Sequence, residues 1–76
     1  MRLDLFLKTA RLIKRRTIAK EFCDRGLVVV NGKAAKPSYE VKDGDQITLK
    51  FGEIILELIA HIEIKGTKEI VSYEGR

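Results

Sequence analysis

The sequence predicts an α+β fold in which two short N-terminal helices pack on one face of a small antiparallel sheet of four to five strands. Three observations lead to this prediction. Apolar residues recur at helical spacing through the first third of the chain. After Gly26, glycines and an Asn-Gly pair divide the rest into short segments. Those segments are rich in β-branched residues or alternate apolar with polar side chains.

Two helices are expected before Gly26. Leu3, Phe6, Leu7 and Ala10 stand at i, i+3, i+4 and i+7, which predicts a helix from about Leu3 to Ala10. A second helix is expected to begin near residues 14–16 and to end at Arg25, with Gly26 as its left-handed cap. Its apolar face would consist of Ile18, Ala19, Phe22 and Cys23.

Strands are expected after Gly26. Val28 to Val30 is β-branched, and Asn31-Gly32 is a strong signal for a hairpin turn. Pro37 would stop the short return strand, because proline cannot donate a ladder hydrogen bond. The last residues, 74–76, are expected to fray. The expected strands cover residues 27–30, 33–36, 46–51, 54–64 and 69–73.

Length and composition limit the possible functions. With 76 residues, the chain is expected to form one domain, residues 1–76, whose small core leaves little room for a buried catalytic cleft. Cys23 is the single cysteine, so no internal disulfide can form, and we expect a cytoplasmic protein. No signal peptide is visible, and the longest apolar stretch, Ile54 to Ile62, is too short to span a bilayer.

The charge is concentrated at one end of the chain. Residues 1–20 carry seven cations and one acid, whereas residues 21–76 carry eight cations and ten acids. Cations in the first turn of a helix oppose its dipole, which suggests that they serve something other than folding. The densest part holds Arg11, Lys14, Arg15, Arg16 and Lys20 between apolar residues, and we expect a rigid element to display them to a phosphate backbone.

A series of short motifs, spread over residues 1–51, resembles the S4 domain, a small RNA-binding module. The resemblance implies an RNA-binding fold that contacts ribosomal RNA and tRNA on the large ribosomal subunit without catalysis of its own. The motifs are Arg2-Leu3-Asp4-x-Phe6-Leu7, Arg11, Lys14-Arg15-Arg16-Thr17-x-Ala19, Gly26-x-Val28-x-Val30-Asn31-Gly32, Lys36-Pro37-Ser38 and Val41-x-x-Gly44-Asp45.

Within that family the chain resembles the stand-alone bacterial members, which are the fifteen-kilodalton heat-shock protein and the RqcP type. The RqcP type is the better match, because the chain ends soon after the sheet and lacks the long basic extension of the heat-shock protein. This resemblance implies a role in ribosome-associated quality control on obstructed large subunits, where the protein would hold the tRNA in place.

The expected RNA contacts combine the cations with the Asn-Gly turn. That turn should bring Asn31 and Lys33 beside the helix cations, and arginines are favoured where a phosphate is held by two hydrogen bonds. Asp4 is expected to orient a neighbouring Arg or Lys. The predicted RNA-binding residues are Arg2, Lys8, Arg11, Lys14, Arg15, Arg16, Lys20, Asn31, Lys33 and Lys36.

Other sites find little support in the sequence. Cys23 is expected to be a core residue, and His61 has no partner arranged for catalysis. We therefore expect neither an enzyme, nor a metal site, nor a cofactor. Tyr39 and Tyr73 could each stack on a base, but no aromatic pair stands at strand spacing to form a platform.

Two alternatives remain open. The chain could be the RNA-targeting module of a modifying enzyme such as a pseudouridine synthase, although it supplies no candidate active site. It could also be a basic module for a protein or an anionic membrane, but its apolar residues are needed for the core. We expect a monomer when the protein is free of RNA.

Overall fold

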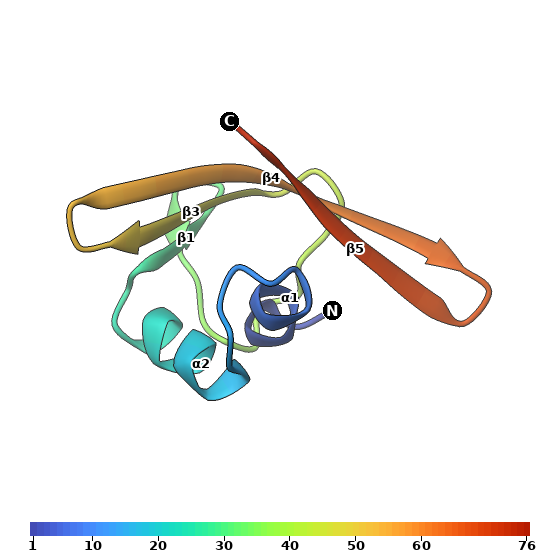
Figure 1. Cartoon of the computed structure of the whole chain (residues 1–76), viewed down its shortest axis with the longest axis horizontal. Helices are drawn as coiled ribbons and strands as arrows, with labels where there is room; N and C mark the ends of the chain where they lie inside the picture. Colours follow the sequence, from blue (N-terminus) through green and yellow to red (C-terminus); the bar gives the residue numbers. More distant parts are fainter.

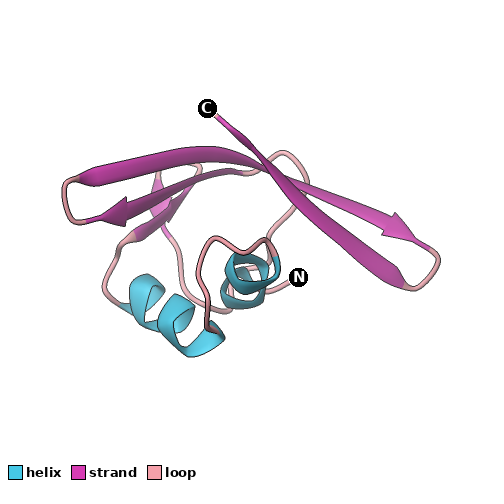
Figure 2. Ribbon diagram, in the orientation of Figure 1, coloured by secondary structure: helices cyan, strands magenta, loops and turns pink.

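A computed structural model describes all 76 residues. Both helices lie on one side of a twisted five-stranded sheet, and the last two strands extend beyond the helices as a hairpin (Figures 1 and 2). The predicted fold is thus observed. The elements are α1 (Leu3–Thr9), α2 (Arg16–Asp24), β1 (Val28–Val30), β2 (Lys33–Ala34), β3 (Gln46–Phe51), β4 (Ile54–Lys65) and β5 (Lys68–Gly75).

The sheet has the strand order β2-β1-β3-β4-β5, and every neighbouring pair is antiparallel. Val30 pairs with Ile47, and Ile47 pairs with Leu58, so these three side chains stand on the same face. All three are buried, as the face toward the helices requires. The alternation expected for residues 46–51 therefore sets which face of the sheet forms the core.

The helical layer supplies the other half of the core. Leu3, Phe6 and Leu7 of α1 are fully buried, and α2 contributes Ala19 and Cys23. Burial raises the pKa of the Cys23 thiol to about 11, so this cysteine behaves as the small core residue that the sequence suggested.

The second helix begins at Arg16, the last of the positions expected for its start. The amides of Leu12 and Ile13 both donate to the Leu7 carbonyl, at 3.0 and 3.1 Å, so the chain folds back over the end of α1. Arg11 takes a left-handed backbone conformation with φ 61°, which no helix can include. Residues 10–15 consequently form a loop, and α2 starts at Arg16.

The apolar face of α2 is also narrower than expected. Ile18 remains 39% exposed, so its assignment to the buried face was wrong. Phe22 is half-buried at the edge of the core, where its ring lies 5.2 Å from that of Phe51 on β3. Gly26 does adopt the expected left-handed conformation, with φ +72°.

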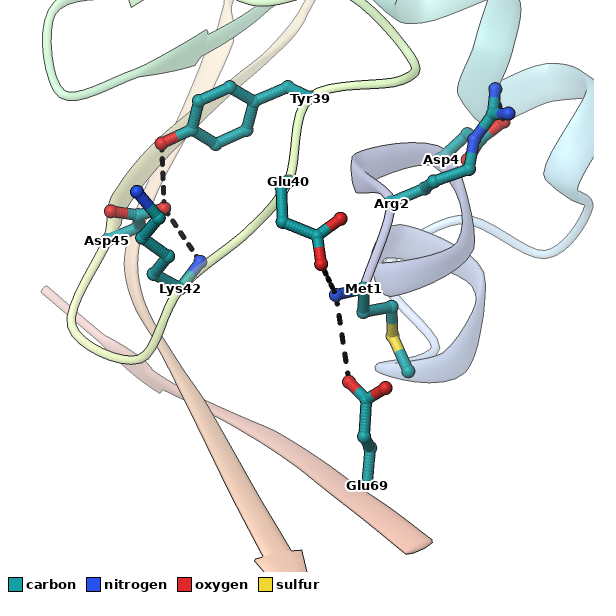
Figure 3. Close-up of polar contacts among 8 residues, drawn as sticks. All are labelled: Met1, Arg2, Asp4, Tyr39, Glu40, Lys42, Asp45 and Glu69. Atoms are coloured by element: carbon teal, nitrogen blue, oxygen red, sulfur yellow. Dashed lines mark hydrogen bonds and ion pairs between the residues drawn. The ribbon is translucent and has the colours of Figure 1, made fainter. Parts of the chain in front are cut away.

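The N-terminus is bound to the segment that leads into β3. The Leu3 amide donates to the Tyr39 carbonyl at 2.8 Å, and the Val41 amide donates to the Met1 carbonyl at 2.9 Å. The terminal ammonium lies between Glu40 and Glu69, at 2.8 and 3.7 Å (Figure 3). Residues 1–4 are therefore held rigidly, although a chain end is often mobile.

Strand lengths differ from the expectation at both edges of the sheet. The return strand β2 ends at Ala34, before Pro37. β5 runs to Gly75, and the Arg76 amide donates to the Glu57 carbonyl at 2.9 Å, so the predicted fraying of residues 74–76 was wrong. None of the helices is long and apolar enough to cross a membrane.

Candidate nucleic-acid interface

Two arginines from different elements meet at one buried carboxylate. The Nε and Nη2 atoms of Arg2 lie 3.3 and 3.4 Å from the two oxygens of Asp4, and the Nε of Arg16 lies 3.4 Å from Asp4 Oδ2. The Asp4 side chain is only 4% exposed, whereas those of Arg2 and Arg16 are 49% and 46% exposed. We call these residues the Arg2–Asp4–Arg16 cluster. It confirms that Asp4 orients neighbouring cations, and Figure 3 shows Arg2 beside Asp4.

The position of this cluster follows from where the helices begin. Arg2 is the extended residue before α1, and Arg16 is the first residue of α2. Asp4 stands in the first turn of α1, where the helix dipole favours a negative charge. The two helix starts therefore meet at one acid, which offsets the unfavourable placement of Arg16.

The Asp4 carboxylate stays ionised. Burial by itself would raise its pKa, but the Leu5 amide, which donates to Oδ1 at 2.8 Å, and the Arg16 guanidinium outweigh burial and lower the pKa below its usual value. Each arginine side chain still has about half of its surface exposed. Both can therefore donate further hydrogen bonds to an anion outside the protein.

The other predicted cations are exposed but do not share one rigid surface. Arg11, Lys14 and Arg15 lie in the loop between the helices, and only Arg16 and Lys20 stand on α2. Lys8 is in the last turn of α1. The expectation that one rigid element carries the five cations of residues 11–20 was wrong, because the loop begins where the chain folds back over α1.

An open hollow of about 460 Å³ joins cations from three parts of the chain. Arg2, Lys20 and Lys36 line it, together with Cys23, Asp24, Pro37 and Ser38. We call it the Lys20 hollow. It brings Lys36, which is distant in sequence, beside the N-terminal cations, as an extended anion-binding groove requires.

A second hollow of about 560 Å³ adjoins it and shares Lys36 and Ser38. We call it the Tyr39 hollow. Lys33 lines it as well, so the Asn31-Gly32 turn does place a cation next to the Lys20 hollow. The complete lining is Val30, Asn31, Lys33, Ala34, Ala35, Lys36, Ser38 and Tyr39.

Asn31 has internal partners. Its Nδ2 donates to Asp45 Oδ1 at 3.0 Å, and its Oδ1 accepts from the Gln46 amide at 2.9 Å. The Tyr39 hydroxyl donates to Asp45 Oδ2 at 3.0 Å (Figure 3). Burial, together with this carboxylate, raises the pKa of Tyr39, so the hydroxyl stays protonated as a donor. These contacts give Asn31 a structural role beside its predicted RNA contact.

Sequence reasoning did not single out Ser38 as a site residue and did not place Tyr39 in a hollow. The family motif Lys36-Pro37-Ser38 could have indicated that Ser38 belongs to the site. No pattern in the sequence indicated that Tyr39 would line a hollow together with two lysines. His61 lies elsewhere, between Asp43 and Glu74, at 3.6 and 3.8 Å.

Comparisons with known proteins show the family and the fold of this chain. The family model described as the S4 domain matches residues 1–47. The chain is 49% identical to the RQC P-site tRNA stabilizing factor of Halalkalibacterium halodurans, over 97% of this chain and 80% of that protein. It is 51% identical to the factor of the same name from Bacillus subtilis, over 88% and 77%. The trimeric structure of heat shock protein 15 from Vibrio cholerae superposes with a TM-score of 0.82 at 33% identity, covering 100% of this chain and 81% of that one.

Proposed function

Because the chain belongs to the S4-domain family, and within it to the RQC P-site tRNA stabilizing factors, we propose that it binds tRNA and ribosomal RNA on obstructed large ribosomal subunits. It acts there as a cytoplasmic, non-catalytic protein that stabilises the tRNA during ribosome-associated quality control. Relatives that match nearly the whole chain carry the name of a stabilizing factor and not that of an enzyme, which supports this function over that of a targeting module.

The Arg2–Asp4–Arg16 cluster is the observation that carries the proposal. It presents two half-exposed arginine side chains whose shared carboxylate is buried. Because Asp4 already holds both arginines, the pair is preorganised. Less side-chain entropy is therefore lost when a phosphate binds. In this proposal the exposed loop cations Lys14 and Arg15 also attract the phosphate backbone. No contact holds them in a fixed geometry as Asp4 holds the two arginines. The remaining predicted contacts, Lys8, Arg11, Lys20, Asn31, Lys33 and Lys36, extend the surface on both sides.

Co-sedimentation with large subunits tests this function. The protein should pellet with large subunits that carry a P-site peptidyl-tRNA, and binding to vacant subunits should be weaker. The double variant Arg2→Ala, Arg16→Ala should lose roughly 100-fold or more in affinity, because each of two charge-assisted contacts contributes about 1.5–3 kcal/mol.

A matched control uses two cations at the tip of the β4–β5 hairpin. Lys65→Ala, Lys68→Ala removes the same charge from exposed residues that pair across the two strands. It should change the affinity by less than about twofold, since long-range attraction between exposed charges is screened by salt. Equal losses for the two double variants would show that net charge, and not the cluster, determines binding.

A further inference from the structure

The Tyr39 hollow differs in chemistry from the other hollows of the molecule. Its walls contain Val30, Ala34, Ala35 and Tyr39, with Lys33 and Lys36 in the lining and no acidic residue. The two hollows beside the β4–β5 hairpin are lined by acids, Asp43 and Glu63 in one and Glu40, Asp43 and Glu69 in the other. The Tyr39 hollow alone combines an apolar wall with cations and lacks carboxylates.

The tyrosine in this hollow is held rigidly. Its hydroxyl donates to Asp45 Oδ2, which also accepts from the Lys42 amide at 2.9 Å, and its carbonyl accepts from the Leu3 amide. Figure 3 shows the ring extended between the chain and Asp45. An aromatic ring fixed at both ends loses little conformational entropy when another ring stacks on it.

The hollow also has a suitable size and place. Its volume of about 560 Å³ falls within the range of roughly 300–1,000 Å³ that is typical of small-molecule sites. Lys36 and Ser38 connect it to the Lys20 hollow and so to Arg2. An RNA strand whose phosphates lie at Arg2 and Lys20 would continue directly into it.

We propose that the Tyr39 hollow receives one unpaired nucleobase of the bound RNA. The base packs against Tyr39, Ala34 and Ala35, while Lys33 and Lys36 contact the phosphates on either side of it. This inference rests on the proposed RNA-binding function and adds base stacking to contacts that otherwise involve only the backbone. It also explains why an apolar surface lies between two exposed lysines.

Three RNA hairpins of equal length test the proposal. The first has a single bulged 2-aminopurine, the second has an abasic ribose at the bulge, and the third is fully paired. The bulged hairpin should bind roughly fivefold or more tightly than the abasic one, as a stacked base contributes about that much. The fluorescence of 2-aminopurine should fall on binding, because the base stacks on the tyrosine.

Variants locate the base. Ala34→Leu fills the hollow at an exposed strand position, so the fold should be kept. It should abolish the preference for the bulged hairpin and leave the abasic hairpin bound within about twofold. Tyr39→Ala should do the same if it folds, whereas Tyr73→Ala, which removes the other tyrosine, 43% exposed on β5, should change nothing.

The outcomes separate this inference from the proposed function. If the unmodified protein binds the bulged and abasic hairpins equally, the nucleobase site is wrong and the phosphate contacts stand. If the preference survives Ala34→Leu, the base lies elsewhere and the site is wrong. If none of the hairpins binds at all, both the nucleobase site and binding to structured RNA are wrong.

Discussion

The helical end and the β4–β5 hairpin of this protein differ in both packing and charge. Leu3, Phe6 and Leu7 in α1 are fully buried, whereas Ile64 and Ile70 near the hairpin tip are 71% and 44% exposed. Residues 1–20 carry seven cations and one acid, while β4 and β5 together carry four acids and two lysines. Figure 1 shows the hairpin reaching beyond both helices.

This difference shows how a small chain separates folding from binding. The core extends along β4 as far as Ala60, which is buried and exchanges hydrogen bonds with Gly44 and Asp45. Residues 61–65 of β4 pair with no strand other than β5. The cations stand around the well-packed part, where a rigid base can hold them at fixed positions. We therefore expect substitutions at the helical end to change stability or RNA affinity, and the same substitutions in the hairpin to change little.

The largest contrast should appear in stability. Phe6→Ala removes a fully buried ring and should lower the free energy of unfolding by about 3–5 kcal/mol through the cavity it leaves. Ile64→Ala, at a highly exposed position, should stay within about 0.5 kcal/mol. Urea denaturation followed by circular dichroism measures both. A comparable loss for Ile64→Ala would mean that the hairpin is part of the cooperative core.

Salt dependence sharpens the contrast in charge. If the helical end neutralises about four to six phosphates, the log–log slope of RNA affinity against salt should be roughly −3 to −5. Lys14→Ala, Arg15→Ala should make that slope shallower by about 1–2, and Lys65→Ala, Lys68→Ala should leave it unchanged. Fluorescence anisotropy from 50 to 200 mM salt measures the slope. A slope near zero would remove the electrostatic basis of the proposed interface.

The sequence predicted the fold well because its signals were local. Gly26 and Asn31-Gly32 mark where helix gives way to strand and where the strand reverses, and the structure has both features where expected. The expected start of α2 near residues 14–16 includes the observed start at Arg16, but the left-handed conformation of Arg11 was not predicted, because it depends on hydrogen bonds to the end of α1. A tertiary contact of this kind leaves no periodic trace in the sequence.

The candidate site was predictable in composition but not in arrangement. The basic residues and the orienting role of Asp4 could be inferred from charge and from the family motifs. That Arg2 and Arg16 meet at Asp4 depends on the packing of α1 against α2. The approach of Lys36 to Arg2 and Lys20 likewise needs the three-dimensional path of residues 35–45.

Acid should destabilise the helical end through Asp4. Its pKa in the folded protein lies below the usual value, so its contribution to stability is present above about pH 4 and is lost as the pH falls through the lower, folded pKa. Asp4→Asn should cost about 1.5–3 kcal/mol at pH 7, the value of hydrogen bonds to a charged group, and progressively less as the pH falls below about 4. Urea denaturation of both proteins from pH 7 downward checks whether the stability of Asp4→Asn approaches that of the unmodified protein. If the difference in their free energies of unfolding is the same at every pH, the Asp4 charge does not stabilise the fold.

The smallest expected change in stability concerns Arg16. Variants of this residue distinguish its contact with Asp4 from its contact with RNA. Arg16→Ala should lower stability by about 0.5–1 kcal/mol, because the guanidinium is half-exposed and salt bridges of this kind are weak. Asp4 would keep the Leu5 amide and Arg2 as partners. Arg16→Lys restores a positive charge near Asp4 and should recover most of that stability.

RNA affinity should respond differently to the same pair of variants. Lysine cannot form two parallel hydrogen bonds to a phosphate, so Arg16→Lys should bind RNA several-fold more weakly than the unmodified protein. Thermal melting and RNA titration of Arg16→Ala and Arg16→Lys together give the result. If Arg16→Lys recovers affinity as fully as stability, Arg16 acts as a simple charge, and the preorganised guanidinium pair is not what the RNA recognises.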